Sequence, residues 1–131
     1  MKYVLDTNIL IYFFKGVGKV SDHLLAKPPN VIWIPTIVLF ELEVGIGKSR
    51  SPKKRREQLN EFLSLVNIIP FGKDEAICAS DIRITLERKG FPIGPYDVLI
   101  AGSALAAKAT LVTHNMKEFS RVEALKIEDW Y

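Results

Sequence analysis

Short apolar runs alternate with longer stretches of helical character along the chain. The runs have the length of buried strands and cover residues 2–5, 31–34, 67–71 and 110–113, with a further short strand expected near 126–127. Apolar spacing, capping residues and breaks at glycine or proline predict helices over about 9–14, 20–26, 36–48, 51–66, 73–89 and 98–108. Strands that alternate with such helices predict an α/β fold, a layered sandwich around a mainly parallel sheet.

Two of the predicted helices differ in how much of their surface is apolar. In helix 73–89, Cys78, Ile82 and Leu86 are spaced four residues apart, which predicts that this stripe faces the core. Helix 98–108 is apolar on all sides, which predicts that the whole helix is buried. A charged residue at its start, Asp97, therefore needs a partner such as a cation.

The composition narrows the class of protein. The 131 residues have the size of one domain, 1–131, and 48% apolar with 25% charged residues is typical of a globular chain. No apolar run approaches the ~20 residues that a membrane span requires. Asp6 interrupts the first apolar run before a signal-peptide core is formed, and the single cysteine excludes an internal disulfide and a cysteine-built metal site. We therefore expect a cytoplasmic protein with no membrane partner.

Two other classes of site are poorly supported. Residues 47–49 are similar to the end of a phosphate-binding loop, but the full pattern requires glycine where the chain has Leu42. The two histidines, His23 and His114, have no nucleophile motif around them. We therefore interpret both histidines as ordinary surface or core residues.

Several acidic residues lie where packing alone does not explain them. Asp6 follows the first strand, at the carboxyl edge where ligands of parallel α/β folds bind, although helix capping also accounts for an Asp here. Asp97 lies in the first turn of a helix, where the helix dipole is the simpler explanation. Glu41 and Glu43 both interrupt an apolar helix, and helical spacing alone does not choose between them.

The fourth predicted strand brings further polar residues to the same edge of the sheet. It ends at Thr113, His114 and Asn115, which lie near Asp6 if the first and fourth strands are neighbours. Three acids that converge on one crevice repel one another unless metal ions neutralise them. Because the ligands are oxygen atoms, with no cysteine and little histidine, they favour Mg²⁺, with Mn²⁺ as the alternative.

Four motifs occur in a fixed order over almost the full length of the chain. They are Val4-Leu5-Asp6-Thr7-Asn8, Glu41-Leu42 followed by Gly45, Tyr96-Asp97-Val98-Leu99-Ile100-Ala101, and Leu111-Val112-Thr113-His114-Asn115 with Glu118-Phe119 beyond. Together they resemble the motifs of PIN-domain ribonucleases of the VapC type, the toxins of bacterial and archaeal toxin–antitoxin systems. The resemblance implies a PIN-like three-layer sandwich and a Mg-dependent endoribonuclease that hydrolyses RNA phosphodiester bonds.

The resemblance also implies which side chains form the site. The family places its helical acid directly before leucine and four residues before glycine, which selects Glu41 over Glu43. The catalytic site then matches Asp6, Glu41, Asp97 and Asn115, with Asp6 and Asp97 as the metal ligands and Thr7, Asn8 and Thr113 as residues that orient them. Asn115 stands where many relatives have a fourth acid, and Glu118, three residues later, is a candidate for the missing charge or a surface residue.

Basic residues are concentrated in one segment. Six of the 18 lie within nine positions, at Lys48, Arg50, Lys53, Lys54, Arg55 and Arg56. Such a run is usually only the solvated start of a helix. Beside an acidic nuclease site it also supplies the positive charge that attracts a phosphate backbone, so we expect contacts with RNA from Lys53, Lys54, Arg55 and Arg56.

A toxin ribonuclease also implies protein partners, namely an antitoxin and a second copy of the chain in a homodimer. Candidates for a groove that accepts an antitoxin helix are apolar residues of the early helices, Tyr12, Phe13, Phe14, Leu24 and Leu25; the alternative for each of them is a place in the core. An arginine of the antitoxin would then enter the acidic site. Three other functions stay open: a catalytically silent RNA-binding protein of the same fold, a housekeeping RNA-processing nuclease, and a small-molecule-binding α/β domain.

Overall fold

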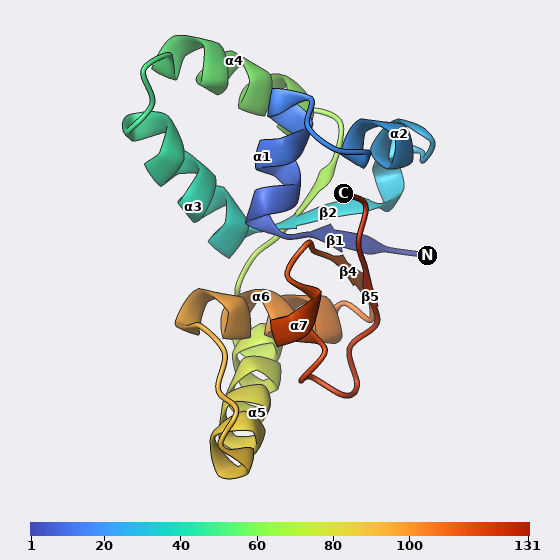
Figure 1. Ribbon diagram of the computed structural model, residues 1–131, viewed down its shortest axis with the longest axis vertical. Coiled ribbons are helices and arrows are strands. Elements are labelled where there is room, and N and C mark those ends of the chain that lie inside the picture. Colours follow the sequence, from blue (N-terminus) through green and yellow to red (C-terminus); the bar gives the residue numbers. More distant parts are fainter.

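Five parallel strands form the central sheet, in the order β3-β2-β1-β4-β5 (Figure 1). In this computed structural model, which describes residues 1–131, the strands are β1 (Tyr3–Leu5), β2 (Ile32–Pro35), β3 (Asn67–Ile69), β4 (Thr110–Val112) and β5 (Ile127–Glu128). The predicted parallel sheet is confirmed, and each strand lies within two residues of its expected position.

Helices form a layer on each side of the sheet (Figure 1). One layer contains α1 (Thr7–Lys15), α2 (Val20–Leu25), α3 (Thr36–Gly47) and α4 (Pro52–Leu63), and the other contains α5 (Lys73–Lys89), α6 (Pro95–Ala106) and α7 (Met116–Phe119). A 3-10 turn, η1 (Pro29–Val31), leads into β2. The predicted three-layer sandwich is therefore confirmed. None of these helices combines the length and the apolar character that a membrane crossing requires.

The core lies between the sheet and the two helical layers. Leu5, Ile34 and Leu111 of the three central strands are fully buried, because helices cover both faces of a parallel sheet. Helix α6 is buried over most of its surface, as its apolar sequence predicts. It packs closely on α5 at Gly102, where a Cβ atom would lie 2.7 Å from the Cβ of Ala79.

Two core predictions are wrong in detail. The buried residues of α5 are Ala79, Ile82 and Leu86, whereas Cys78 is only half-buried. A spacing of three and then four residues follows the 3.6-residue helical period, and a strict spacing of four drifts off the buried face. Leu24, a candidate for the partner groove, is instead part of the core with 5% of its surface exposed.

The topology brings the two central strand ends together. In the pairing of β1 with β4, Leu5 lies opposite Val112, so the residues that follow each strand meet at the carboxyl edge of the sheet. Helix α1 starts directly after Asp6, and α3 starts directly after β2 and contacts both α1 and α6. This edge is the ligand-binding edge of parallel α/β folds.

Candidate active site

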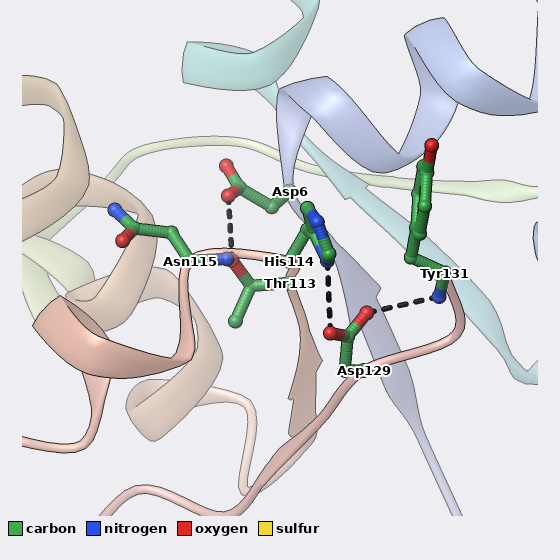
Figure 2. Close-up of polar contacts among 6 residues, drawn as sticks. All are labelled: Asp6, Thr113, His114, Asn115, Asp129 and Tyr131. Atoms are coloured by element: carbon green, nitrogen blue, oxygen red, sulfur yellow. Dashed lines mark hydrogen bonds and ion pairs between the residues drawn. The ribbon is translucent and has the colours of Figure 1, made fainter. Parts of the chain in front are cut away.

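Asp6 is held rigidly at the end of β1. Its backbone N–H donates to the carbonyl of Val112 at 2.9 Å, which continues the pairing of β1 with β4 by one residue. Its Oδ1 accepts from the backbone N–H of Thr7 at 2.8 Å, and its Oδ2 accepts from the Thr113 hydroxyl at 2.9 Å (Figure 2). The carboxylate therefore caps α1 and is aimed at the crevice at the same time.

The turn after β4 is tied to the same carboxylate. The backbone N–H of Asn115 donates to the Thr113 hydroxyl at 2.9 Å, and that hydroxyl donates onward to Asp6. The Asn115 amide donates to Oε2 of Glu118, at 3.1 Å. The position of Thr113 thus agrees with its predicted role of orienting the Asp6 carboxylate. Asn115 connects this carboxylate to α7.

The two glutamates of α3 have different surroundings. Oε1 of Glu41 accepts from the Thr7 hydroxyl at 2.8 Å, which places Glu41 beside Asp6. Glu43 lies on the surface, where its carboxylate pairs with both terminal nitrogens of Arg56, and these hydrogen bonds lower the pKa of Glu43. The geometry therefore agrees with the choice of Glu41, which spacing alone does not make.

Asp97 lies in the first turn of α6 and faces the other acids. Burial raises its pKa to about 6, and the negative charges of Asp6, Glu118 and Glu41 add to the shift, as does a side-chain hydrogen bond with Glu118. Burial also raises the pKa of Asp6; hydrogen bonds from Thr113 and Thr7 oppose this shift, and the charge of Glu41 adds to it. Four carboxyl groups from four separate segments therefore share one crevice.

The structure also places Glu118 and Asn8, two further candidates from the sequence. Glu118, left open as a site or surface residue, lies within the electrostatic range of Asp97 and bonds Asn115. It is brought there by α7, a helix of four residues, which is too short to show periodicity in the sequence. Asn8 is exposed and makes no side-chain hydrogen bond, so its orienting role stays a prediction.

The donor set suits a hard divalent cation. The crevice offers carboxylate, hydroxyl and amide oxygens, which are the ligands of Mg²⁺ and Mn²⁺. No group of three or more His, Cys, Asp and Glu side chains surrounds a single point. Mg²⁺ is commonly held by only one or two protein carboxylates and completes its shell with water and substrate phosphate. Asp6 and Asp97 fit this role, since a bound cation would offset both the burial and the neighbouring negative charges that raise the pKa of Asp97.

The basic run lies at the start of α4. Lys53 and Lys54 are exposed, and Arg55 donates to Gln58 at 2.9 Å. Of the four residues predicted to contact RNA, only Arg56 pairs with an acid. The positive charge that remains without an acidic partner is therefore carried by Lys53, Lys54 and Arg55.

A pocket of about 390 Å³ opens between α1, α3 and α4 and reaches the acidic crevice at Glu41. Its walls are mainly apolar, and Lys15 and Arg55 add positive charge. The apolar side chains are those of Ile11, Phe14, Leu42, Ile46 and Leu59. A larger pocket, of about 520 Å³, lies beside α5 and α6 and includes none of the predicted site residues.

Comparisons with known proteins agree with this architecture. The PIN domain family matches residues 3–125. Ribonuclease VapC2 of Rickettsia felis is 43% identical over 136 residues, covering 99% of this chain and 98% of its own. The tRNA(fMet)-specific endonuclease VapC of Salmonella typhimurium is 35% identical over 130 residues, with the same coverage of both chains.

A solved structure shows the same fold. It is that of VapBC2 from Rickettsia felis bound to a DNA fragment from the VapBC2 promoter. One of its chains superposes on this protein with a TM-score of 0.92 at 40% identity, and 100% of both chains is covered. The family match spans most of the sequence, and the relatives exceed 30% identity over nearly the whole chain. The chain therefore belongs to the PIN-domain family.

Proposed function

We propose that this protein is a divalent-metal-dependent endoribonuclease and the toxin of a type II toxin–antitoxin pair. The observation that carries the proposal is the meeting of Asp6, Glu41 and Asp97 at the carboxyl edge of the sheet, with Glu118 beside them. Two relatives, a ribonuclease and a tRNA(fMet)-specific endonuclease, support the same chemistry. We expect it to act in the cytoplasm.

The side chains of the crevice would divide the work of hydrolysis. Asp6 and Asp97 hold the cation, for which Mg²⁺ is the first candidate and Mn²⁺ the second. A bound ion would supply Lewis-acid chemistry for the hydrolysis of the phosphodiester. Thr113 and Thr7 fix the carboxylates of Asp6 and Glu41 by direct hydrogen bonds, so these oxygens are preorganised before substrate arrives.

Asn115 and Glu118 act as a unit in this proposal. The Asn115 amide carries no charge, but it donates to the Glu118 carboxylate, whose charge acts on Asp97. Glu118 thereby contributes the fourth negative charge that position 115 lacks. The pair holds the α7 side of the crevice in place for the metal and its water molecules.

The start of α4 is proposed as an RNA contact. Lys53, Lys54 and Arg55 have no acidic partner, and Arg55 lines the pocket that reaches Glu41. Arg56 contributes to RNA binding only if the phosphate backbone competes with Glu43. Positive charge beside the acidic crevice draws the RNA backbone towards it.

The same pocket is proposed to receive the antitoxin. Phe14 lines it and packs against Phe13 and Phe62, so of the five apolar candidates in the sequence only Phe14 belongs to the pocket wall. An arginine of the antitoxin would reach Glu41 from this pocket and compete with the metal. The similarity to a VapBC2 chain supports a protein partner. The homodimer stays a prediction, to be checked by sedimentation of the purified chain.

Cleavage of RNA by the purified protein tests the proposal. With tRNA(fMet) as the first substrate, we expect cleavage that requires Mg²⁺ or Mn²⁺, stops in EDTA and is abolished by Asp6→Asn. RNA binding without cleavage would favour the silent binding protein, and neither binding nor cleavage would favour a small-molecule domain. Growth arrest on expression, relieved by the neighbouring small protein, separates a toxin from a housekeeping nuclease.

A further inference from the structure

His114 is fixed in one orientation beside the crevice. Its Nδ1 lies 2.9 Å from Oδ2 of Asp129 (Figure 2). The other oxygen of Asp129 accepts the backbone N–H of Tyr131 at 2.9 Å, so the carboxylate is itself held in place. This arrangement couples the last residues of the chain to the strand end that carries Thr113 and Asn115.

Two tyrosines further restrict the imidazole ring. Tyr131 stacks on it with ring centroids 4.3 Å apart and an angle of 27° between the planes. Tyr12 of α1 meets it edge-on at 5.8 Å, and the carbonyl of Tyr131 is anchored by the backbone N–H of Lys19 at 2.8 Å. Rotation of the ring would break these contacts together, so His114 is positioned more strictly than an ordinary surface histidine.

The contact with Asp129 determines what the other ring nitrogen can do. The Asp129 carboxylate only accepts hydrogen bonds, so Nδ1 of His114 must carry the proton. In the neutral ring Nε2 is then an acceptor. The structure contains no protein donor to Nε2, and 43% of the side chain is exposed. The neutral ring therefore offers a ligand an acceptor of fixed orientation.

The position of this acceptor relates it to the substrate. His114 directly follows Thr113, whose hydroxyl bonds Asp6, and directly precedes Asn115. In Figure 2 the ring stands on one side of Asp6 and the Asn115 side chain on the other. RNA with its scissile phosphate at Asp6 would thus place a flanking nucleotide over His114.

We propose that Nε2 of His114 accepts a hydrogen bond from the 2′-hydroxyl of a ribose that flanks the scissile phosphate, so that His114 selects RNA over DNA. The inference rests on the proposed function. Phosphate oxygens only accept hydrogen bonds, whereas the 2′-hydroxyl donates, is attached to every RNA sugar and distinguishes RNA from DNA at a given site. His114 is therefore a specificity-determining residue, and Asp129 and Tyr131 position it.

Single-atom changes in the substrate test this contact. After the cleavage site is mapped with the wild-type protein, two further RNAs carry one 2′-deoxynucleotide each, on the 5′ or the 3′ side of the scissile phosphate. For one of them, wild-type kcat/KM should fall about fivefold to tenfold, the value of one hydrogen bond. His114→Asn retains a donor to Asp129 but lacks the acceptor at the ε position. It should therefore cleave the unmodified RNA and that deoxy RNA equally well, with the kcat/KM that the wild type has on the deoxy RNA.

Matched variants separate this role from a structural one. His114→Gln offers an acceptor at the ε position and should recover part of the discrimination. His23→Asn changes the other histidine, which stacks on Trp130, and should retain the full wild-type ratio. Equal losses on both substrates in His114→Asn, or no wild-type discrimination at either position, would overturn the proposal. Absence of any metal-dependent cleavage by the wild type would overturn the proposed function and this inference with it.

Discussion

Replacement of Asp97 by Asn should stabilise the metal-free protein while it abolishes activity. The pKa of Asp97 is raised from its ordinary value of 3.8 to about 6, because the carboxyl is partly buried and surrounded by Asp6, Glu118 and Glu41. A shift of about two units corresponds to about 3 kcal/mol. Since Asp97 is only half-buried, solvent screening reduces this, and we expect Asp97→Asn to raise the free energy of unfolding at pH 7 by about 1–2 kcal/mol.

The sign of the pH dependence follows from linkage. Between pH 4 and 6 the folded protein keeps a proton on Asp97 that the unfolded chain has lost, so the stability of the wild type falls as pH rises through this window. Below pH 4 both states are protonated and the advantage of Asp97→Asn should vanish. Urea unfolding of both proteins in EDTA, at pH 7 and pH 4, measures this difference.

Two further measurements make the reasoning refutable. Glu43→Gln removes an acid whose pKa is lowered by Arg56, so it should not stabilise the protein at pH 7. Mg²⁺ or Mn²⁺ at 100 times its dissociation constant should stabilise the wild type by about 2.7 kcal/mol and Asp97→Asn far less. If Asp97→Asn unfolds cooperatively but is no more stable than the wild type at pH 7, the claim that ionised Asp97 is destabilised by its surroundings is refuted.

Three other changes give distinct outcomes. Glu41→Gln should lower kcat/KM on RNA about tenfold to a hundredfold, whereas Glu43→Gln should change it less than about twofold, and the reverse order would move the site to Glu43. Removal of charge from Lys53 and Lys54 should flatten the slope of log RNA affinity against log salt by about 1.4, or about 0.7 per lost contact, and an unchanged slope would exclude the patch. Gly102→Ala should lower the free energy of unfolding by about 1–3 kcal/mol in urea titrations, because the new methyl group overlaps Ala79; a gain in stability would contradict this close packing.

The fold was largely predictable because its signals are local. Apolar runs of strand length, capping residues and breaks at glycine or proline each act over a few residues, and the structure has α4 and α5 where these signals predict helices. The order of the strands is a long-range property. From the sequence, Asp6 and Thr113 were expected to meet if β1 and β4 are neighbours. The structure meets this condition, because Leu5 of β1 lies opposite Val112 of β4.

The site was less predictable because it depends on contacts between distant segments. Helical spacing treats Glu41 and Glu43 alike, and the difference arises from Thr7 on one side and Arg56 on the other. Glu118 reaches the crevice on a four-residue helix that has no periodic signal. The interpretation of His114 as an ordinary residue rested on the absence of a nucleophile motif, and its orientation depends on a residue 15 positions away.

Direct titration of Mn²⁺ into the metal-free protein, followed by calorimetry or by the paramagnetic signal of the free ion, tests the central claim without any substrate. The wild type should bind the ion saturably at pH 7.5, more weakly as pH falls below 6, while Asp6→Asn and Asp97→Asn should lose binding and remain folded. Equal Mn²⁺ affinity in the wild type and both variants, or no saturable binding by the wild type, would contradict the assignment of this acidic crevice as the metal centre.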